Sequence, residues 1–207
     1  MVVNSGGRSL VSGREKKSLL HVSIRFLVVV CCCALATLAV AGPRDRERIM
    51  VGLDLFPSLL AADRDITAKV GPDGKLLLVL VYRDDRENVQ PFVEHLRRVG
   101  TIRNIPIRIQ CLPVPLQSHA EMVPAGIFII QHLTRSEVRQ VAQFGEEHQV
   151  VTFSPFAGDV EEGILAGIFI TDRILPYVNL ATMKRSSIRL KPFFLRIAKT
   201  HAPAKTQ

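Results

Sequence analysis

Residues 75–82 read KLLLVLVY, a continuous apolar run about as long as one β-strand. A run without polar alternation is typical of a strand buried on both faces, as in a parallel sheet that helices cover. The turn GPDG at 71–74 precedes this run, and the polar residues Arg83 and Asp84 end it. The stretch therefore predicts a central strand of a covered sheet.

Three more strands are predicted in the middle of the chain. AGIFII at 125–130 and VVTF at 150–153 are apolar runs of strand length. IPIRIQCL at 105–112 alternates between apolar and polar residues, as a strand with one covered face does. The stretch 113–122 has no clear periodicity and is expected to be irregular or a short helix.

Segments whose apolar residues have helical spacing lie between these strands. Residues 86–100 place apolar side chains on one helical face, and Asp84 or Asp85 is expected to cap that helix. Thr134 precedes the segment 135–148, and Glu137 stands three residues later, which is the pattern of a capping box. Strands and helices therefore alternate through the middle of the chain, as they do in a parallel α/β sheet.

Further elements are predicted on both sides. An apolar helical face runs through 49–60, where Pro57 should kink or split the helix. After the strands at 165–170 and 174–178, Asn179 is expected to cap a short helix, and 192–200 forms a last helix. The prediction is an α/β fold: a three-layer, mostly parallel sheet flanked by helices, in one Rossmann-like domain. The closing strands are expected to be antiparallel additions.

The first 41 residues have the pattern of a secretory signal peptide. Basic residues precede the 15-residue apolar core FLVVVCCCALATLAV at 26–40, and Ala39-Val40-Ala41 resembles a cleavage site. The core is short for a membrane span, which needs about 20 apolar residues. We expect cleavage near Ala41, an exported periplasmic domain over 42–200 and a flexible tail at 201–207. An uncleaved N-terminal anchor is the alternative.

Charge and cysteine content disfavour several functions. The chain has 27 basic and 19 acidic residues, but no dense basic block in its middle, so nucleic-acid binding is not expected. Only Cys111 follows the leader, where it is expected to be a small buried residue of a strand. No C-x-x-C or H-x-x-x-H spacing suggests a metal, and no cofactor is expected.

Polar residues follow three predicted strands at their carboxyl ends. Arg83 and Asp84 follow the first, His132 the second and Ser154 the third. In open α/β sheets ligands bind beyond the carboxyl ends of the strands, so these residues are candidates for a ligand or partner site. Ser154 lacks the G-x-S-x-G context of a hydrolase nucleophile, and Arg83 with Asp84 could simply form a pair.

The loop FSPFAGDVEEG at 153–163 is the second candidate. Its phenylalanines are expected to anchor it to the core, and Gly158 and Gly163 to allow its turns. Its acids, Asp159 and Glu161 among them, are then expected to face outward as a recognition surface. A hydrolase that uses these acids ranks last, because an exposed carboxylate pair lacks the burial that separates two pKa values.

The second half of the chain resembles the YfiR-like (YfiR/HmsC) family. The resemblance rests on GIFI at 167–170, RILPYVN at 173–179 and IRLKPFFLRIAK at 188–199, and KLLLVLVYRDD and AGIFII agree with it. It implies a periplasmic, non-catalytic regulator that modulates an inner-membrane signalling protein of the diguanylate cyclase or sensor kinase type, and so acts in cyclic-di-GMP signalling. A periplasmic small-molecule receptor is the alternative function. A homodimer stays open.

Overall fold

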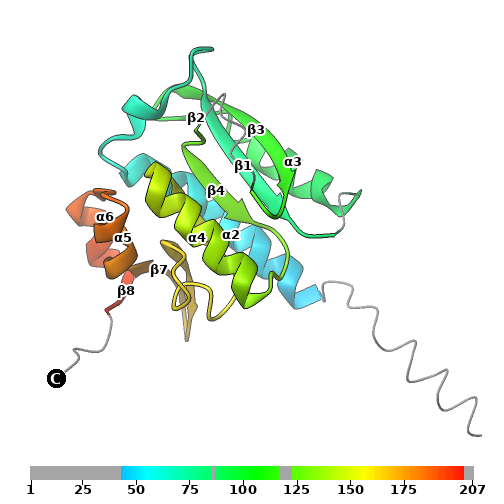
Figure 1. The fold of residues 1–207 in the computed structure, drawn as a ribbon, viewed down its shortest axis with the longest axis vertical. Coiled ribbons are helices and arrows are strands. Elements are labelled where there is room, and N and C mark those ends of the chain that lie inside the picture. The colour runs from blue at the N-terminus through cyan, green and yellow to red at the C-terminus, as the bar shows by residue number, and fades with distance from the viewer. Residues whose placement is uncertain (1–42, 85–86, 117–122, 203–207) are drawn as a thin grey trace, which may run out of the picture. The chain divides into compact units, whose positions relative to one another are not determined.

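An eight-stranded sheet forms the centre of the described chain, in the strand order β2-β3-β1-β4-β5-β6-β7-β8 (Figure 1). The structure is a computed structural model that describes residues 43–84, 87–116 and 123–202. The pairs β2–β3 and β6–β7 are antiparallel, and the other neighbours are parallel. The strands are β1 (Leu76–Tyr82), β2 (Thr101–Ile102), β3 (Ile105–Pro113), β4 (Gly126–Ile129), β5 (Val151–Ser154), β6 (Ala166–Ile170), β7 (Ile174–Asn179) and β8 (Lys199–His201).

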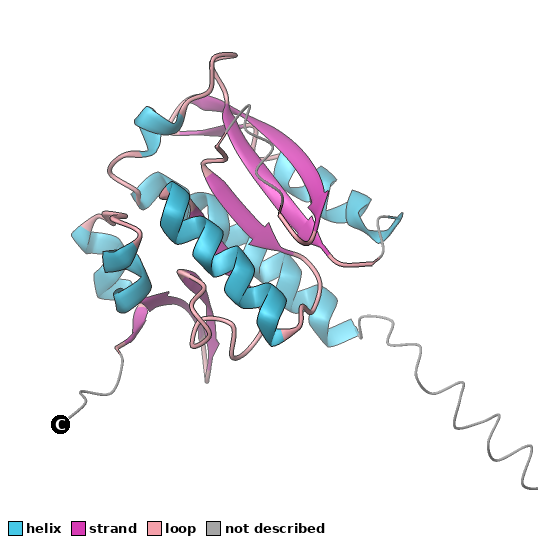
Figure 2. Ribbon diagram, viewed as in Figure 1, coloured by secondary structure: helices cyan, strands magenta, loops and turns pink. Residues whose placement is uncertain are grey.

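Helices cover both faces of this sheet (Figure 2). The helices are α2 (Pro43–Ala62), α3 (Gln90–Arg97), α4 (Arg135–His148), α5 (Leu180–Arg185) and α6 (Pro192–Ile197), with 3-10 turns η1 (Ile66–Lys69) and η2 (Glu87–Val89). Phe153 of β5 packs against Phe56 of α2, whereas the next residue back, Thr152, approaches α4 at Gly145. Successive strand residues point to opposite faces, so α2 and α4 lie on opposite sides. The predicted three-layer, mostly parallel α/β fold is confirmed.

The aromatic part of the core lies between α2 and the central strands. All seven residues of β1 are buried, as its unbroken apolar sequence predicts. Phe128 of β4 stacks on Phe153 with ring centroids 5.2 Å apart, and Phe56 meets Phe128 edge-on at 5.4 Å. Gly126 permits this close approach, because a Cβ atom there would lie 2.7 Å from the Phe56 ring. The small residue thus lets α2 lie flat on β4.

The start of α4 agrees with the sequence. The Thr134 hydroxyl oxygen accepts a hydrogen bond from the Glu137 backbone N–H at 3.3 Å, and the Glu137 carboxylate accepts from the Thr134 N–H at 2.7 Å. This reciprocal pair is the predicted capping box. It fixes the first turn of α4 at the end of β4, where the candidate site lies.

Four details differ from the sequence prediction. Helix α2 continues through Pro57 without splitting, because its buried apolar face outweighs the lost backbone hydrogen bond. The N-cap of α3 is Val89, so Asp84 does not cap it, and η2 intervenes. The last helix ends at Ile197, and Lys199–His201 form β8 instead of a helix end and tail. The short strand β2 was not predicted at all.

The C-terminal segment is fastened to the end of α2. Asp63 is almost fully buried and forms an ion pair with Lys69 at 2.7 Å. Backbone bonds then join the two segments, from the Arg64 N–H to the Arg189 carbonyl and from the Lys191 N–H to the Ala62 carbonyl, both at 2.9 Å. These contacts position α6, which follows directly.

Contacts divide the chain into two units, Met1–Gly42 and Pro43–Gln207, and the whole described core belongs to the second. No helix within the described ranges is both long and apolar enough to cross a bilayer. The predicted signal peptide, Asp85 and most of the stretch 113–122 lie outside the described residues. The described unit therefore has its own core.

Candidate functional site

The carboxyl ends of β1, β4 and β5 lie at one edge of the sheet, because these strands are parallel neighbours. The structure therefore brings Arg83, His132 and Ser154 to that edge, as expected. Gln131 joins the first two strand ends: its side-chain oxygen accepts the backbone N–H groups of Arg83 at 2.8 Å and Asp84 at 3.2 Å. The edge is held together by side chains as well as by the strand ladder.

Arg83 and Asp84 lie at the exposed rim of this edge. The Arg83 guanidinium is 3.6 Å from the Asp84 carboxylate and 3.5 Å from Glu137 of α4. Exposed pairs of this kind stabilise a fold by at most about 1 kcal/mol. The two residues pair with each other and with α4, and they lie outside the pocket described below.

His132 stands between the edge and the start of α2. Its Nε2 atom is 3.2 Å from a carboxylate oxygen of Asp45, and its ring packs on Phe156 with centroids 4.0 Å apart. Arg48 of α2 also reaches the loop, donating two hydrogen bonds to the Pro155 carbonyl at 3.0 and 3.2 Å. The N-terminal part of α2 therefore braces the loop that follows β5.

Ser154 and Asp159 form the inner contact of that loop. Ser154 is fully buried, and its hydroxyl donates to the Asp159 carboxylate at 2.5 Å while accepting the Phe156 N–H at 3.2 Å. The prediction that Asp159 faces outward is wrong, since its side chain is half-buried against Ser154. A buried hydroxyl needs a partner, and this carboxylate is the one within reach.

The other two acids of the loop are also engaged. Glu162 pairs with Arg135 at 2.9 Å and with Arg139 at 2.8 Å, both on α4. Glu161 is exposed, but accepts a hydrogen bond from the Tyr177 hydroxyl at 2.9 Å. Burial, together with this bond to Glu161, raises the pKa of Tyr177 to about 12. Only Glu161 keeps the outward position predicted for the acids, and it too is anchored.

The backbone of the loop turns at two glycines, as predicted. Gly158 and Gly163 have φ angles of +92° and +119°, a region that favours glycine. Phe153 and Phe156 are buried and hold the loop to the core, which confirms their anchoring role. The loop is thus an ordered crossover between the parallel strands β5 and β6, with a defined inner wall.

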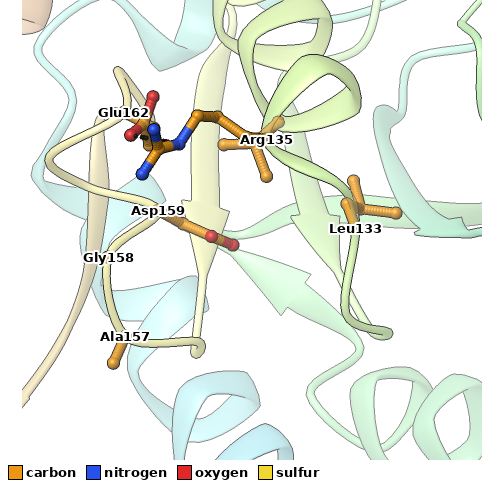
Figure 3. Close-up of a pocket in the computed structure, with 7 residues that line it drawn as sticks. Leu133, Arg135, Ala157, Gly158, Asp159 and Glu162 are labelled. Carbon is orange, nitrogen blue, oxygen red and sulfur yellow. Dashed lines mark ion pairs between the residues drawn. The ribbon is translucent and has the colours of Figure 1, made fainter.

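A pocket lies between this loop and the start of α4 (Figure 3). Its volume is about 180 Å³, and its lining residues are Leu133, Arg135, Val138, Ala157, Gly158, Asp159 and Glu162. Figure 3 shows the Asp159 side chain between the loop and Leu133, and the Arg135–Glu162 ion pair at one side. The pocket therefore combines an apolar part with charged groups of both signs.

The electrostatics of the pocket centre on Asp159. Burial raises the pKa of its carboxyl, while the Ser154 hydroxyl and the charge of His132 lower it and the neighbouring Glu161 and Glu162 raise it further. The net direction is upward, so the carboxyl is less well solvated than an ordinary surface aspartate. Such a group gains more than a surface carboxylate does from a ligand that donates hydrogen bonds.

The Asp159→Asn variant should show this directly. The pKa of Asp159 is higher in the folded than in the unfolded chain, so stability falls as the pH rises through the window between those two values. The asparagine side chain cannot ionise, so the variant avoids this loss of stability, and its side-chain oxygen still accepts the hydrogen bond from the Ser154 hydroxyl. We expect a higher Tm than wild type at pH 7 and a smaller difference below pH 3.8, the ordinary value for this carboxyl. The exposed Asp172→Asn serves as the control, and an equal gain at both sites would contradict the assignment.

The described residues at this edge do not form a nucleophile–base pair. The Ser154 hydroxyl bonds to Asp159 and to the backbone, rather than to a histidine that could act as its base. Within the described ranges, no three His, Cys, Asp or Glu side chains gather as metal ligands would. Cys111 lies in β3 and is only half-buried, so it is less buried than predicted.

Sequence reasoning missed several residues of the site. Leu133 lines the pocket just before α4, Arg135 and Val138 line it from the first turn of α4, and Gln131 joins the strand ends. The first three stand directly after the predicted strand 125–130, so the rule that ligands lie beyond carboxyl ends could have included them. Arg48 and Asp45 carry no such signal, because they are remote in sequence.

No protein-family model matches the chain, and no curated protein matches it. Among solved structures, it is similar to the ABC domain in complex with L-Trp from Streptococcus pneumoniae, with 12% identity and a TM-score of 0.45, over 69% of this chain and 61% of that one. A ligand-free, open substrate-binding protein with adhesive properties from Clostridium difficile has 12% identity and a TM-score of 0.48, over 74% of this chain and 59% of that one.

A conserved domain protein from Vibrio cholerae O1 biovar El Tor has 12% identity and a TM-score of 0.49, over 73% of this chain and 59% of that one. The chain thus spans about three fifths of the length of each of these structures. Similarity this distant does not identify a ligand or a function.

Proposed function

We propose that this protein binds a small molecule, without transforming it, at the carboxyl edge of the sheet. The observation that carries the proposal is the pocket between the loop 155–163 and the start of α4. Leu133 and Val138 supply apolar contact, and Asp159 supplies a half-buried carboxylate. A concave site with an apolar wall and a few convergent polar groups is the usual form of a ligand site.

The lining limits what the ligand can be. A volume of about 180 Å³ is below the roughly 300–1,000 Å³ of pockets for drug-sized ligands, so the ligand is small or only partly enclosed. Asp159 favours a group that donates hydrogen bonds, such as an ammonium. Arg135, which pairs with Glu162, offers a guanidinium for a carboxylate or phosphate. A small zwitterionic or amphipathic molecule matches this set.

A thermal-shift screen with amino acids, sugars and small anions tests the proposal. A ligand at 100 times its Kd stabilises the fold by about 2.7 kcal/mol, which corresponds to a Tm increase of roughly 5–10 °C for a domain of this size. The apparent affinity for that ligand should fall at least tenfold in Arg135→Ala, because this variant removes a lining residue. Arg139→Ala is the matched control, because Arg139 also pairs with Glu162 but does not line the pocket. If no compound raises the Tm, or if both variants lose affinity equally, the proposal is refuted.

A regulatory role is the second candidate, in which the periplasmic protein modulates an inner-membrane signalling protein. Support comes from the tip of the β6–β7 hairpin, where Ile170 and Ile174 are cross-strand partners and both are about half exposed. Exposed apolar side chains that lie together are one mark of a protein-interaction site. Osmotic-shock release followed by crosslinking to the membrane fraction tests location and partner together. Retention in the cytoplasm would exclude this role.

A further inference from the structure

Helix α6 presents an apolar and basic face to solvent. Phe193 is 50% exposed and Ile197 is 57% exposed, the latter the highest fraction among the exposed large apolar side chains of the described residues. Arg196 is exposed as well. Residues separated by three and four positions share one face of a helix, so Phe193, Arg196 and Ile197 stand side by side. This solvent-facing set is called the α6 face below.

The opposite side of the helix is firmly packed. Phe194 is buried and Leu195 packs against the core. The Phe194 N–H donates to the Lys191 carbonyl at 3.0 Å, and the Ala198 N–H donates to the Phe194 carbonyl at 3.1 Å. The exposure of Phe193 and Ile197 is therefore a fixed property of the fold, since turning them inward would expose Phe194.

The charge around the α6 face has one sign. Residues 173–207 contain no aspartate or glutamate. Two of their cations are neutralised by acids from elsewhere, Arg185 by Glu146 and Arg189 by Asp65. In the described ranges no acidic side chain pairs with Arg196, and Lys199 lies 5.6 Å from the centre of the Phe169 ring. The α6 face thus contains one cation, Arg196, without an acidic partner among the described residues, and Lys199 follows the helix two residues after Ile197.

We propose that the α6 face docks on the surface of a bilayer that contains anionic phospholipids. Phe193 and Ile197 enter the boundary between headgroups and acyl chains, and Arg196 and Lys199 contact lipid phosphates. Apolar side chains with basic neighbours are the pattern of interfacial membrane binding, because hydrophobic insertion and attraction to anionic lipid act together.

A lipid surface fits this face better than an acidic protein does. A stable protein interface buries about 800 Å² on each partner, and α6 has only six residues with two apolar side chains exposed on this face. A bilayer accommodates two inserted side chains without needing a complementary surface. The cations also suit a layer of phosphates whose positions are not fixed. This inference does not depend on the ligand pocket.

Co-sedimentation with vesicles tests the proposal. The protein used begins at Pro43, because that unit holds the described core by itself, and circular dichroism confirms that each variant is folded. Vesicles of phosphatidylcholine with phosphatidylglycerol are compared with pure phosphatidylcholine. We expect tenfold or stronger preference for the anionic vesicles at low salt, weakened by 0.5 M NaCl because salt screens the attraction.

Three double variants separate binding through this face from non-specific adhesion to vesicles. Phe193→Ser with Ile197→Ser should reduce vesicle binding at least tenfold. Ile170→Ser with Ile174→Ser removes similarly exposed apolar side chains at the hairpin tip, beside Asp172, and should leave vesicle binding unchanged. Arg196→Gln with Lys199→Gln should abolish the preference for anionic lipid. No binding to either vesicle type, equal binding to both, or equal loss in the two serine variants would overturn the proposal.

Discussion

Replacing Phe128 with alanine is expected to lower the free energy of unfolding by about 3–5 kcal/mol. Phe128 is fully buried in β4, stacked on Phe153 and edge-on to Phe56. The substitution removes one ring of this three-ring group, in which each ring contacts the other two, and leaves a cavity between α2 and the sheet. A loss of this size is a large share of the roughly 5–15 kcal/mol that stabilises a typical domain.

Urea denaturation followed by circular dichroism measures this effect. Phe193→Ala makes the same chemical change on the exposed α6 face and should alter stability by about 0.5 kcal/mol or less. The contrast between the two variants isolates burial from loss of the ring itself. Similar losses in both would mean that the three rings do not form the centre of the core.

Replacing Asp63 with alanine should cost about 3 kcal/mol, because it leaves a mostly buried Lys69 without its counter-charge. Asp63 is 1% exposed and the Lys69 side chain 16%, and their charged atoms are 2.7 Å apart. The Asp63 carboxylate also accepts the Asp65 N–H at 3.0 Å, so that donor loses its partner too. Because Asp63 adjoins the junction with Leu190, we expect the C-terminal segment to loosen first.

A double-mutant cycle separates the pair from its surroundings. Asp63→Ala with Lys69→Met should recover part of the loss, since removing both charges leaves none buried without a partner. The exposed Asp172→Ala is the matched control and should be nearly neutral. Hydrogen exchange of residues 188–201 reports the loosening. No recovery in the double variant would show that the lysine is already solvated in the fold.

The elements of the fold could be predicted from the sequence where one physical signal dominates. The apolar run of β1 indicates burial on both faces, and Thr134 with Glu137 fixes the start of α4 by local hydrogen bonds. Pro57 shows the limit of local rules, because the packing of α2 on the sheet outweighs the preference of a proline. The residues of β8 look helical in sequence, yet pairing with β7 makes them a strand. Pairing between distant segments leaves no local trace.

The candidate site could be predicted in its location but not in its detail. Parallel strands bring Arg83, His132 and Ser154 to one edge whatever their side chains do. The Asp159 side chain points inward because the buried Ser154 hydroxyl needs a hydrogen-bond partner, and the Asp159 carboxylate, five residues later, accepts its hydrogen bond. Composition alone makes the loop look like a solvated acidic rim. Only its placement over α4 shows that Glu162 faces two arginines.

The two outermost strands of the sheet are also its shortest. β2 has two residues and β8 has three, and β8 carries Lys199 and His201. An edge strand presents unpaired N–H and C=O groups that a second chain could extend, and long apolar edges promote aggregation. Here the fully buried strand β1 is interior, and on the β3 side β2 pairs only with Ile105 and Pro106. The strand order therefore keeps the apolar sequence KLLLVLVY away from the outer edges of the sheet, where it could otherwise pair with a second molecule and start aggregation.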